Sequence, residues 1–209
     1  SHISQIKMLR YQINPHFLFN TLNAISTLVL KGNKEKANGM LTRLATFLRF
    51  SLDNDPEKKI RLYMELKALM LYLEIEKTRF EDRLTVKFKI EPQTDTLLAP
   101  SFLSKPLVEN SIKYAIARMP NGGLIEVSAK CQRGYLHMEV ADNGPAQNQT
   151  SLVAKPKAEA QIASSHTAVG IQNTVDRLDV LYPNEHDFNV ICGSDERYRM
   201  QIPISMEHS

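Results

Sequence analysis

The sequence predicts an α+β protein, with helices in its first part and a layered α/β arrangement in its second. Over residues 1–80 the apolar residues recur at the spacing of a helix. From Arg83 onward apolar and polar residues alternate instead, which is the pattern of a strand with one buried face. With 209 residues the chain is long enough for two modest domains, which we expect at residues 1–80 and 81–209.

Two leucine stripes indicate the helices of the first domain. The stripes are Leu41, Leu44, Leu48 and Leu52, followed by Leu62, Leu66, Leu69 and Leu73. Between them residues 53–56 read D-N-D-P, a composition typical of a turn. Because each helix would bury only one stripe, we expect a helical hairpin that dimerises into a bundle.

Alternation in the second domain predicts four strands, near residues 84–90, 125–129, 136–140 and 200–204. Helical spacing predicts two helices, at about 101–117 and 169–182. Residues 148–167, between the third strand and the second helix, are small and polar and follow no period. Loops of this length are usually functional lids or disordered, so we expect one of the two here.

Composition narrows the possible partners. The formal net charge is only +3 and no basic run is interleaved with aromatic residues, which argues against nucleic acid as a partner. Apolar runs such as Leu22 to Leu30 are too short to span a bilayer, so we expect a soluble piece. Cys131 and Cys192 have no ligand-like spacing, and a reducing compartment fits this cysteine usage best.

A histidine directly follows a proline in N-P-H-F-L-F-N, residues 14–20. The spacing reads as helix on both sides, so we expect Pro15 inside a running helix, bending it so that His16 projects outward. Neutral imidazole carries a nucleophilic ring nitrogen near pH 7, so His16 can accept a phosphoryl group. Taken alone, however, a histidine in a helix is more often structural. Phe17, Leu18 and Phe19 fit the core of a bundle better than a catalytic role.

Three further motifs follow in order: P-L-V-E-N-S-I-K-Y at 106–114, A-D-N-G at 141–144 and V-G-I-Q-N-T-V-D-R-L at 169–178. Glu109 and Asn110 place a carboxylate beside an amide, and such oxygen ligands suit Mg²⁺. By themselves they could equally be the solvated face of an amphipathic helix. Asp142 and Gly144 come directly after a strand, although D-N-G is also a common turn. Gly170 opens a helix, whose N-terminal amides can face phosphate.

Together, the four motifs in this order resemble the LytS/YehU-type sensor histidine kinases. Residues 72–84, Y-L-E-I-E-K-T-R-F-E-D-R-L, are similar to that family's passage from its second helix into its first strand, so the resemblance spans essentially the whole chain. It implies a dimerising helical hairpin followed by a GHKL-type α/β sandwich with a mixed sheet. It also implies the cytoplasmic portion of a protein that is anchored in the bacterial inner membrane by a segment outside this chain.

The same resemblance implies a homodimer that uses ATP and Mg²⁺ to phosphorylate His16 and passes the phosphoryl group to an aspartate of a response regulator. In similar kinases the residue in the place of Asn20 positions the water that removes phosphate from the regulator. Many histidine kinases have an acidic residue after the phosphoacceptor, which helps to deprotonate it. Phe17 stands there in this chain, so the general base is unassigned.

The resemblance also places the Mg-ATP contacts of α/β domains of this type. Asn110 would coordinate Mg²⁺, Glu109 would contact a metal-bound water or assist as a base, and Lys113 would reach phosphate. Asp142 would accept a hydrogen bond from the adenine amino group, and Gly144 would let the backbone approach the ring.

On the last helix the resemblance adds Gly170, Asn173 and Arg177 as residues near the nucleotide. Asn173 and Arg177 lie one turn apart, and Arg177 could instead simply be salt-bridged.

Two positions depart from the family pattern, because Ala146 and Ala168 stand where glycines are usual. Alanine tolerates positive φ poorly, so ATP binding or turnover could be impaired. A non-catalytic dimerisation and docking module that relays a signal is therefore the alternative function. A plain ATPase built from the second domain is a third possibility, but it leaves N-P-H-F-L-F-N unexplained.

Overall fold

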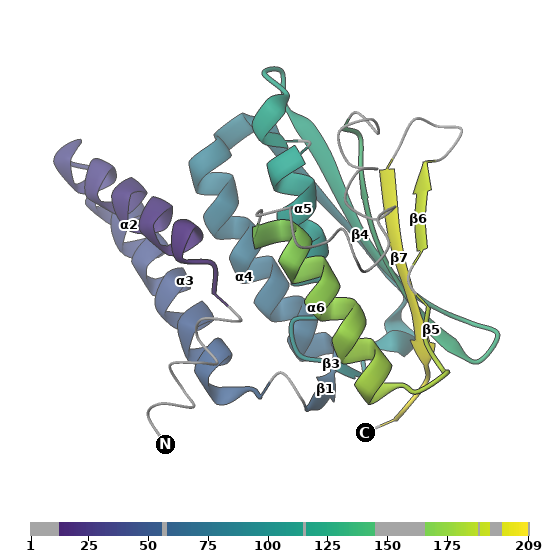
Figure 1. Ribbon diagram of the computed structural model, residues 1–209. Coiled ribbons are helices and arrows are strands. Elements are labelled where there is room, and N and C mark those ends of the chain that lie inside the picture. Colours follow the sequence, from purple (N-terminus) through teal and green to yellow (C-terminus); the bar gives the residue numbers. More distant parts are fainter. Residues whose placement is uncertain are drawn as a thin grey trace.

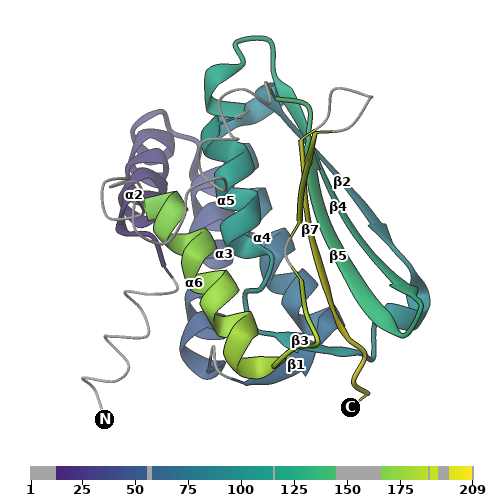
Figure 2. The same cartoon turned by 45° about the vertical axis from the view of Figure 1, so that its right-hand side comes forward.

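The computed structural model describes residues 13–55, 58–114, 116–144, 166–187, 189–192 and 198–208, and it shows three layers (Figure 1). A hairpin of α2 (Pro15–Leu30) and α3 (Lys34–Asp53) forms the first layer. The second contains α4 (Leu62–Phe80), α5 (Lys105–Tyr114) and α6 (His166–Leu181). A five-stranded sheet is the third, and α4, α5 and α6 cover one of its faces in both views (Figure 2).

The sheet is mixed, as predicted, with the strand order β2-β4-β5-β7-β6. Its strands are β2 (Leu84–Ile90), β4 (Gly123–Gln132), β5 (Tyr135–Asp142), β6 (Asn189–Cys192) and β7 (Tyr198–Ser205). Only β2 and β4 pair in parallel, and the connection between them contains α5. Apolar residues alternate along β4 and β5, and their buried faces lie towards the helices, as in Val127 opposite Val140.

Several short elements were not predicted. β1 (Lys59–Arg61) pairs with β3 (Leu98–Pro100) in a separate two-stranded sheet. Single turns of 3₁₀ helix, η1 (Glu81–Arg83), η2 (Pro92–Thr94) and η3 (Ile116–Arg118), connect the larger elements. The long loop expected at 148–167 falls largely outside the described residues, and its last two positions already belong to α6.

An aromatic cluster joins the hairpin to the second layer. It consists of Phe17 on α2, Phe47 and Phe50 on α3, Tyr72 on α4, and Phe102 in the segment before α5. Neighbouring ring centroids lie between 4.9 and 6.0 Å apart. Such rings bury much apolar area and prefer tilted or edge-on contacts, so the cluster makes one continuous core from hairpin to sheet.

Among the described residues, none of the helices has both the length and the apolar character that a membrane-spanning segment requires.

Candidate active site

His16 is exposed in the first turn of α2. The helix begins at Pro15, and the Oδ1 atom of Asn14 caps it by accepting a hydrogen bond of 2.9 Å from the His16 backbone N–H. Proline at the first position costs no helical hydrogen bond, because the first N–H groups of a helix have no acceptor within it. The prediction that Pro15 bends a running helix is therefore wrong, since Pro15 starts the helix and Asn14 lies outside it.

The residues after His16 divide between core and surface. Phe17 is buried against Phe47 and Tyr72, and Leu18 is half-buried. Phe19 is 65% exposed, so it lies outside the core of the single chain and could belong to a bundle core only where a second copy covers it. Consecutive residues lie about 100° apart around a helix, and three in a row cannot all face one side. Asn20, also half-buried, follows His16 by one turn.

Three of the predicted site residues, Glu109, Asn110 and Lys113, lie on α5. Asn110 is fully buried and Glu109 beside it is half-buried, whereas Lys113 is exposed one turn later. Lys105, the first residue of α5, forms an ion pair with Glu109 through Nζ and Oε1. The prediction did not include Lys105, although its spacing of four residues from Glu109 on one helix is a signal for such a pair.

The A-D-N-G motif forms a turn at the end of β5. Asp142 is buried, and its Oδ1 atom accepts a hydrogen bond of 2.9 Å from the Gly144 backbone N–H. Asn143 accepts a hydrogen bond of 2.8 Å from the Leu124 N–H. The Asp142 side chain thus closes a local turn with the backbone two residues later. A carboxylate accepts several hydrogen bonds, so the contact with Gly144 is compatible with recognition of an adenine amino group.

The last helix starts earlier than predicted. Because α6 begins at His166, Gly170 lies in its second turn instead of at its opening. Ala168 is also inside the helix, where alanine is the most favourable residue, while Ala146 lies outside the described residues. Asn173 is half-buried on α6.

Contacts at the end of α6 define its direction relative to α5. Arg177 donates a hydrogen bond of 2.7 Å to the carbonyl oxygen of Ser101, just before α5, and Lys59 lies 4.1 Å from the Tyr182 ring. The end of α6 therefore lies near the start of α5, and the two helices pack against each other. The two helices therefore run in opposite directions, so the earlier turns of α6, with Gly170 and Asn173, lie towards the end of α5. The contact of Arg177 favours its alternative, structural role.

Two buried carboxyl groups on α4 were not predicted. Burial raises the pKa of Glu65 to about 7, against the opposing effect of its hydrogen bonds from the Ser104 backbone and side chain and of the Arg177 charge. Burial likewise raises the pKa of Glu76 to about 7, with Arg79 opposing and Glu109 adding to the effect. Both residues lie on the same buried face of α4 as the leucine stripe. The sequence could have indicated them, because a charged residue at a core position is unusual.

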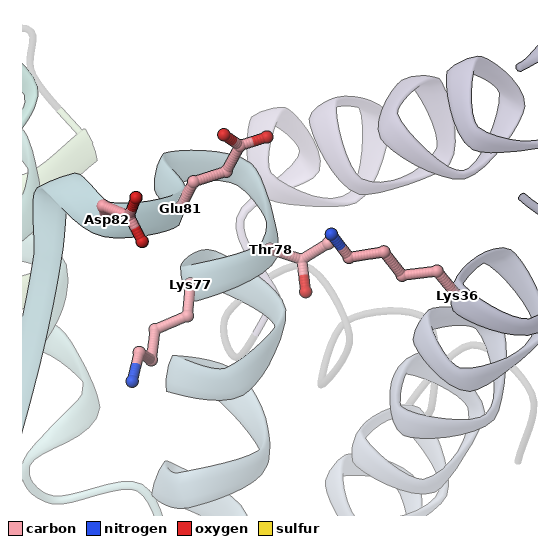
Figure 3. A pocket seen from close by; sticks show the side chains of 5 residues that line it. All are labelled: Lys36, Lys77, Thr78, Glu81 and Asp82. Carbon is pink, nitrogen blue, oxygen red and sulfur yellow. The ribbon is translucent and has the colours of Figure 1, made fainter.

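Two cavities among the described residues lie away from these groups. One, of about 390 Å³, is lined by Lys36 of α3 and by Lys77, Thr78, Glu81 and Asp82 at the end of α4 and in η1. In Figure 3 Lys36 reaches across from α3 towards Thr78. The other, of about 210 Å³, lies between the start of β5 at Tyr135 and residues 184–187. None of the predicted site residues lines either cavity.

Of the predicted nucleotide residues, Asn110 and Lys113 lie on α5, which packs against both β5, where Asp142 is the last residue, and α6, which carries Gly170 and Asn173. His16 and Asn20 lie apart from them on α2, in the hairpin layer (Figure 1). Among the described residues, no three His, Cys, Asp or Glu side chains gather as they would around a fully protein-bound metal ion. Mg²⁺ does not need such a group, because it binds through one or two protein oxygens together with phosphates and water.

Comparison with known proteins agrees with the fold and with the family resemblance. The family model described as histidine kinase matches residues 4–84. The sensor histidine kinase BtsS of Escherichia coli K12 is 30% identical over 201 residues, covering 96% of this chain and 33% of that protein. The sensor protein LytS of Staphylococcus epidermidis is 38% identical over 141 residues, or 68% of this chain and 24% of that protein. The chain thus spans a third or less of the length of these relatives.

Solved structures share the fold at low identity. A bacterial phosphotransferase solved at 1.7 Å superposes with a TM-score of 0.54 at 12% identity, covering 97% of each chain. The histidine kinase domain of the blue-light-activated kinase EL346 from Erythrobacter litoralis gives 0.51 at 13% identity, over 96% of this chain and 92% of that one. These likenesses show the fold alone. The family match and the relatives show that the chain belongs to the sensor histidine kinases of the LytS type.

Proposed function

We propose that the chain is the catalytic portion of a two-component sensor histidine kinase, which transfers the γ-phosphoryl group of ATP to His16 and then to an aspartate of a response regulator. The observation that carries the proposal is the position of His16, exposed in the first turn of a capped helix and fixed by the buried ring of Phe17 beside it. An exposed imidazole on a fixed turn can approach a phosphorus atom with little loss of conformational freedom.

The transfer is a substitution at phosphorus. A ring nitrogen of neutral His16 forms the new N–P bond, while the bond from the γ-phosphorus to the bridging oxygen breaks and ADP leaves with its electron pair. The displaced imidazole proton passes to solvent or to a base from another part of the protein, because Phe17 offers no acid-base group. For the removal of phosphate from the response regulator, Asn20 would orient the attacking water.

The α/β part holds the nucleotide in this proposal. Asn110, with its amide oxygen, and the neighbouring Glu109 carboxylate fit Mg²⁺, which prefers hard oxygen ligands. When bound, Mg²⁺ neutralises charge on the phosphates. Asp142 accepts a hydrogen bond from the adenine amino group, Gly144 lets the backbone approach the ring, and Lys113 reaches a phosphate oxygen.

α6 completes the nucleotide site, with Gly170 and Asn173 lying towards the end of α5. Arg177 supports the segment before α5 through Ser101, a contact that favours positioning over direct binding.

In this proposal the hairpin forms the dimer interface. Apolar side chains exposed on its surface are Phe19, Leu22, Val29 and Leu30 on α2, and Leu41 and Leu52 on α3. A second copy of the hairpin would cover them, which makes a homodimer the natural assembly. The predicted domain boundary at residue 80 assigns α4 to the hairpin. α4 packs against α3 and, with α5 and α6, covers one face of the sheet, so it contacts both predicted domains (Figure 2). We place the chain on the cytoplasmic side of a membrane-anchored protein, as its sensor relatives suggest.

Labelling tests the proposal directly. The purified chain is incubated with Mg²⁺ and γ-labelled ATP, beside His16→Gln and Asn110→Asp. We expect label that is labile in acid and stable in base, as phosphohistidine is, and that is lost in both variants. ATP binding without label in the wild type would favour the docking module instead. A hydrolysis rate that is unchanged by His16→Gln, with no label, would favour the plain ATPase.

A further inference from the structure

Lys105 occupies a costly position. It is the first residue of α5, and its side chain is only 6% exposed. Burial disfavours an ammonium group, and the positive end of the helix dipole at this place disfavours it further. A lysine that precedes its glutamate by four residues is also the weaker order for a helical ion pair. A charged group that costs stability in three ways suggests a role other than holding the fold together.

Three side chains from two helices and a loop contact the ammonium group. Glu109, 17% exposed, pairs with it directly from the next turn of α5. The ring centroids of Tyr72 on α4 and of Phe102 before α5 lie 5.6 and 5.8 Å from Nζ. Glu76, one turn after Tyr72 on α4, contributes a further buried carboxyl group whose charge acts on Lys105 and Glu109. The lysine is thus held between two aromatic rings and directed at Glu109.

Glu109 needs such a partner if it works beside a nucleotide. Its carboxylate would lie next to the polyphosphate and the Asn110 metal position, where like charges repel it. A neighbouring ammonium group neutralises the carboxylate and fixes its rotamer, and buried placement strengthens both effects.

We propose that Lys105 is a positioning residue for Glu109, holding that carboxylate in the orientation in which it assists phosphoryl transfer beside Asn110. This inference rests on the proposed kinase function. Tyr72 gives the arrangement a second connection, because its ring contacts both Lys105 and Phe17, the neighbour of His16. The phosphoacceptor turn and the pair on α5 are therefore packed on the same side chain.

The test is a double-mutant cycle on autophosphorylation. Lys105→Met, Glu109→Gln and the double variant are compared with wild type for the labelling rate at saturating Mg-ATP and for the dissociation constant of Mg-ATP. We expect Lys105→Met to lower the rate about tenfold in wild type but less than about twofold in the Glu109→Gln background, with the dissociation constant changed by less than about threefold. Lys105→Arg keeps the pair and should restore most of the rate.

Lys59 offers a matched control. It also pairs with a carboxylate, Glu207, at 2.5 Å and lies against an aromatic ring, that of Tyr182, but this carboxylate is not one of the predicted site residues. Lys59→Met should lower the labelling rate by a similar factor in both backgrounds. Unfolding curves show which variants are folded, and Lys105→Gln, which can still donate a hydrogen bond, replaces Lys105→Met in the cycle if that variant unfolds.

Equal effects of Lys105→Met in the two backgrounds would overturn the inference and leave the kinase function intact, because Lys105 would then act through stability alone. A faster rate in Lys105→Met would also overturn it, since the lysine would then restrain Glu109. A wild-type chain that binds ATP but takes no label would overturn the proposed function, and the inference with it.

Discussion

The ring of Phe17, the residue that follows His16, lies 4.9 Å from the ring of Tyr72 on α4, measured between centroids. This contact explains why the chain has no acidic residue after its histidine. The side chain at position 17 points into a buried aromatic cluster, where a carboxylate would lose its hydration without gaining a partner. A base for His16 must therefore come from another part of the protein or from solvent.

Phe17→Asp should lower the free energy of unfolding by more than about 3 kcal/mol, because it removes a buried ring and buries a polar group. Tyr63→Asp is the control, since Tyr63 is a half-exposed aromatic residue near the start of α4. It should change the free energy by less than about 1 kcal/mol. Urea denaturation measures both, and similar losses in the two variants would contradict the buried position of Phe17.

The buried carboxyl group of Glu65 predicts how stability depends on pH. Its pKa is about 7 in the folded protein, above the ordinary value of 4.5, so the folded state binds this proton more tightly than the unfolded state. The contribution of Glu65 to stability is thus fully present below about pH 4.5 and is lost as pH rises to about 7, by up to about 3 kcal/mol.

Glu65→Gln tests this dependence, because glutamine keeps an oxygen that can accept the hydrogen bonds from Ser104 but does not titrate. Relative to wild type, the variant should become more stable as pH rises from 5 to 8. The measurement is the difference in unfolding free energy at several pH values. A difference that does not vary with pH would mean that Glu65 titrates normally in the folded protein.

Sequence patterns predicted the larger elements well because those patterns are local. Alternation at 84–90 and 136–140 specifies which side of a strand is buried, and both strands lie in the mixed sheet. The three-residue strands β1 and β3 are too short to show a period, and they form through pairing between distant segments. The prediction for Pro15 was wrong because the apolar spacing continues on both sides of the helix start and does not mark it. The start is marked by the Asn14 cap, which depends on backbone geometry.

Buried polar and charged residues were the hardest to predict. Asn110 and Asp142 belong to short motifs, and the sequence alone picked them out. Glu65 and Lys105 belong to no motif, and their burial results from the way α4 and α5 meet. A sequence shows that a charge lies on an apolar helix face, but the partner that makes its burial possible comes from another helix or loop, as Ser104 does for Glu65.

Asp142→Asn should separate nucleotide recognition from folding. Asparagine keeps an oxygen for the Gly144 N–H, so the turn should remain intact. Its amide group can donate to the O6 atom of guanine, which the carboxylate repels. We expect ATP affinity to fall about tenfold or more and the preference for ATP over GTP to shrink by a similar factor. Titration with both nucleotides measures this, and an unchanged preference would exclude Asp142 from base recognition.

The last prediction concerns the hairpin surface. Phe19 and Leu22 are exposed on one face of α2, three residues apart, and Leu30 near its end is 85% exposed. Stable interfaces of this kind bury about 1,200–2,000 Å², and a glutamate inside one is desolvated without a partner. The double variant Phe19→Glu, Leu22→Glu should therefore raise the dimer dissociation constant at least about 100-fold. Val180→Glu, at a 77% exposed apolar position on α6, should leave it unchanged. Light scattering at tens of micromolar measures all three proteins, and a wild type that is monomeric there would rule out the hairpin dimer.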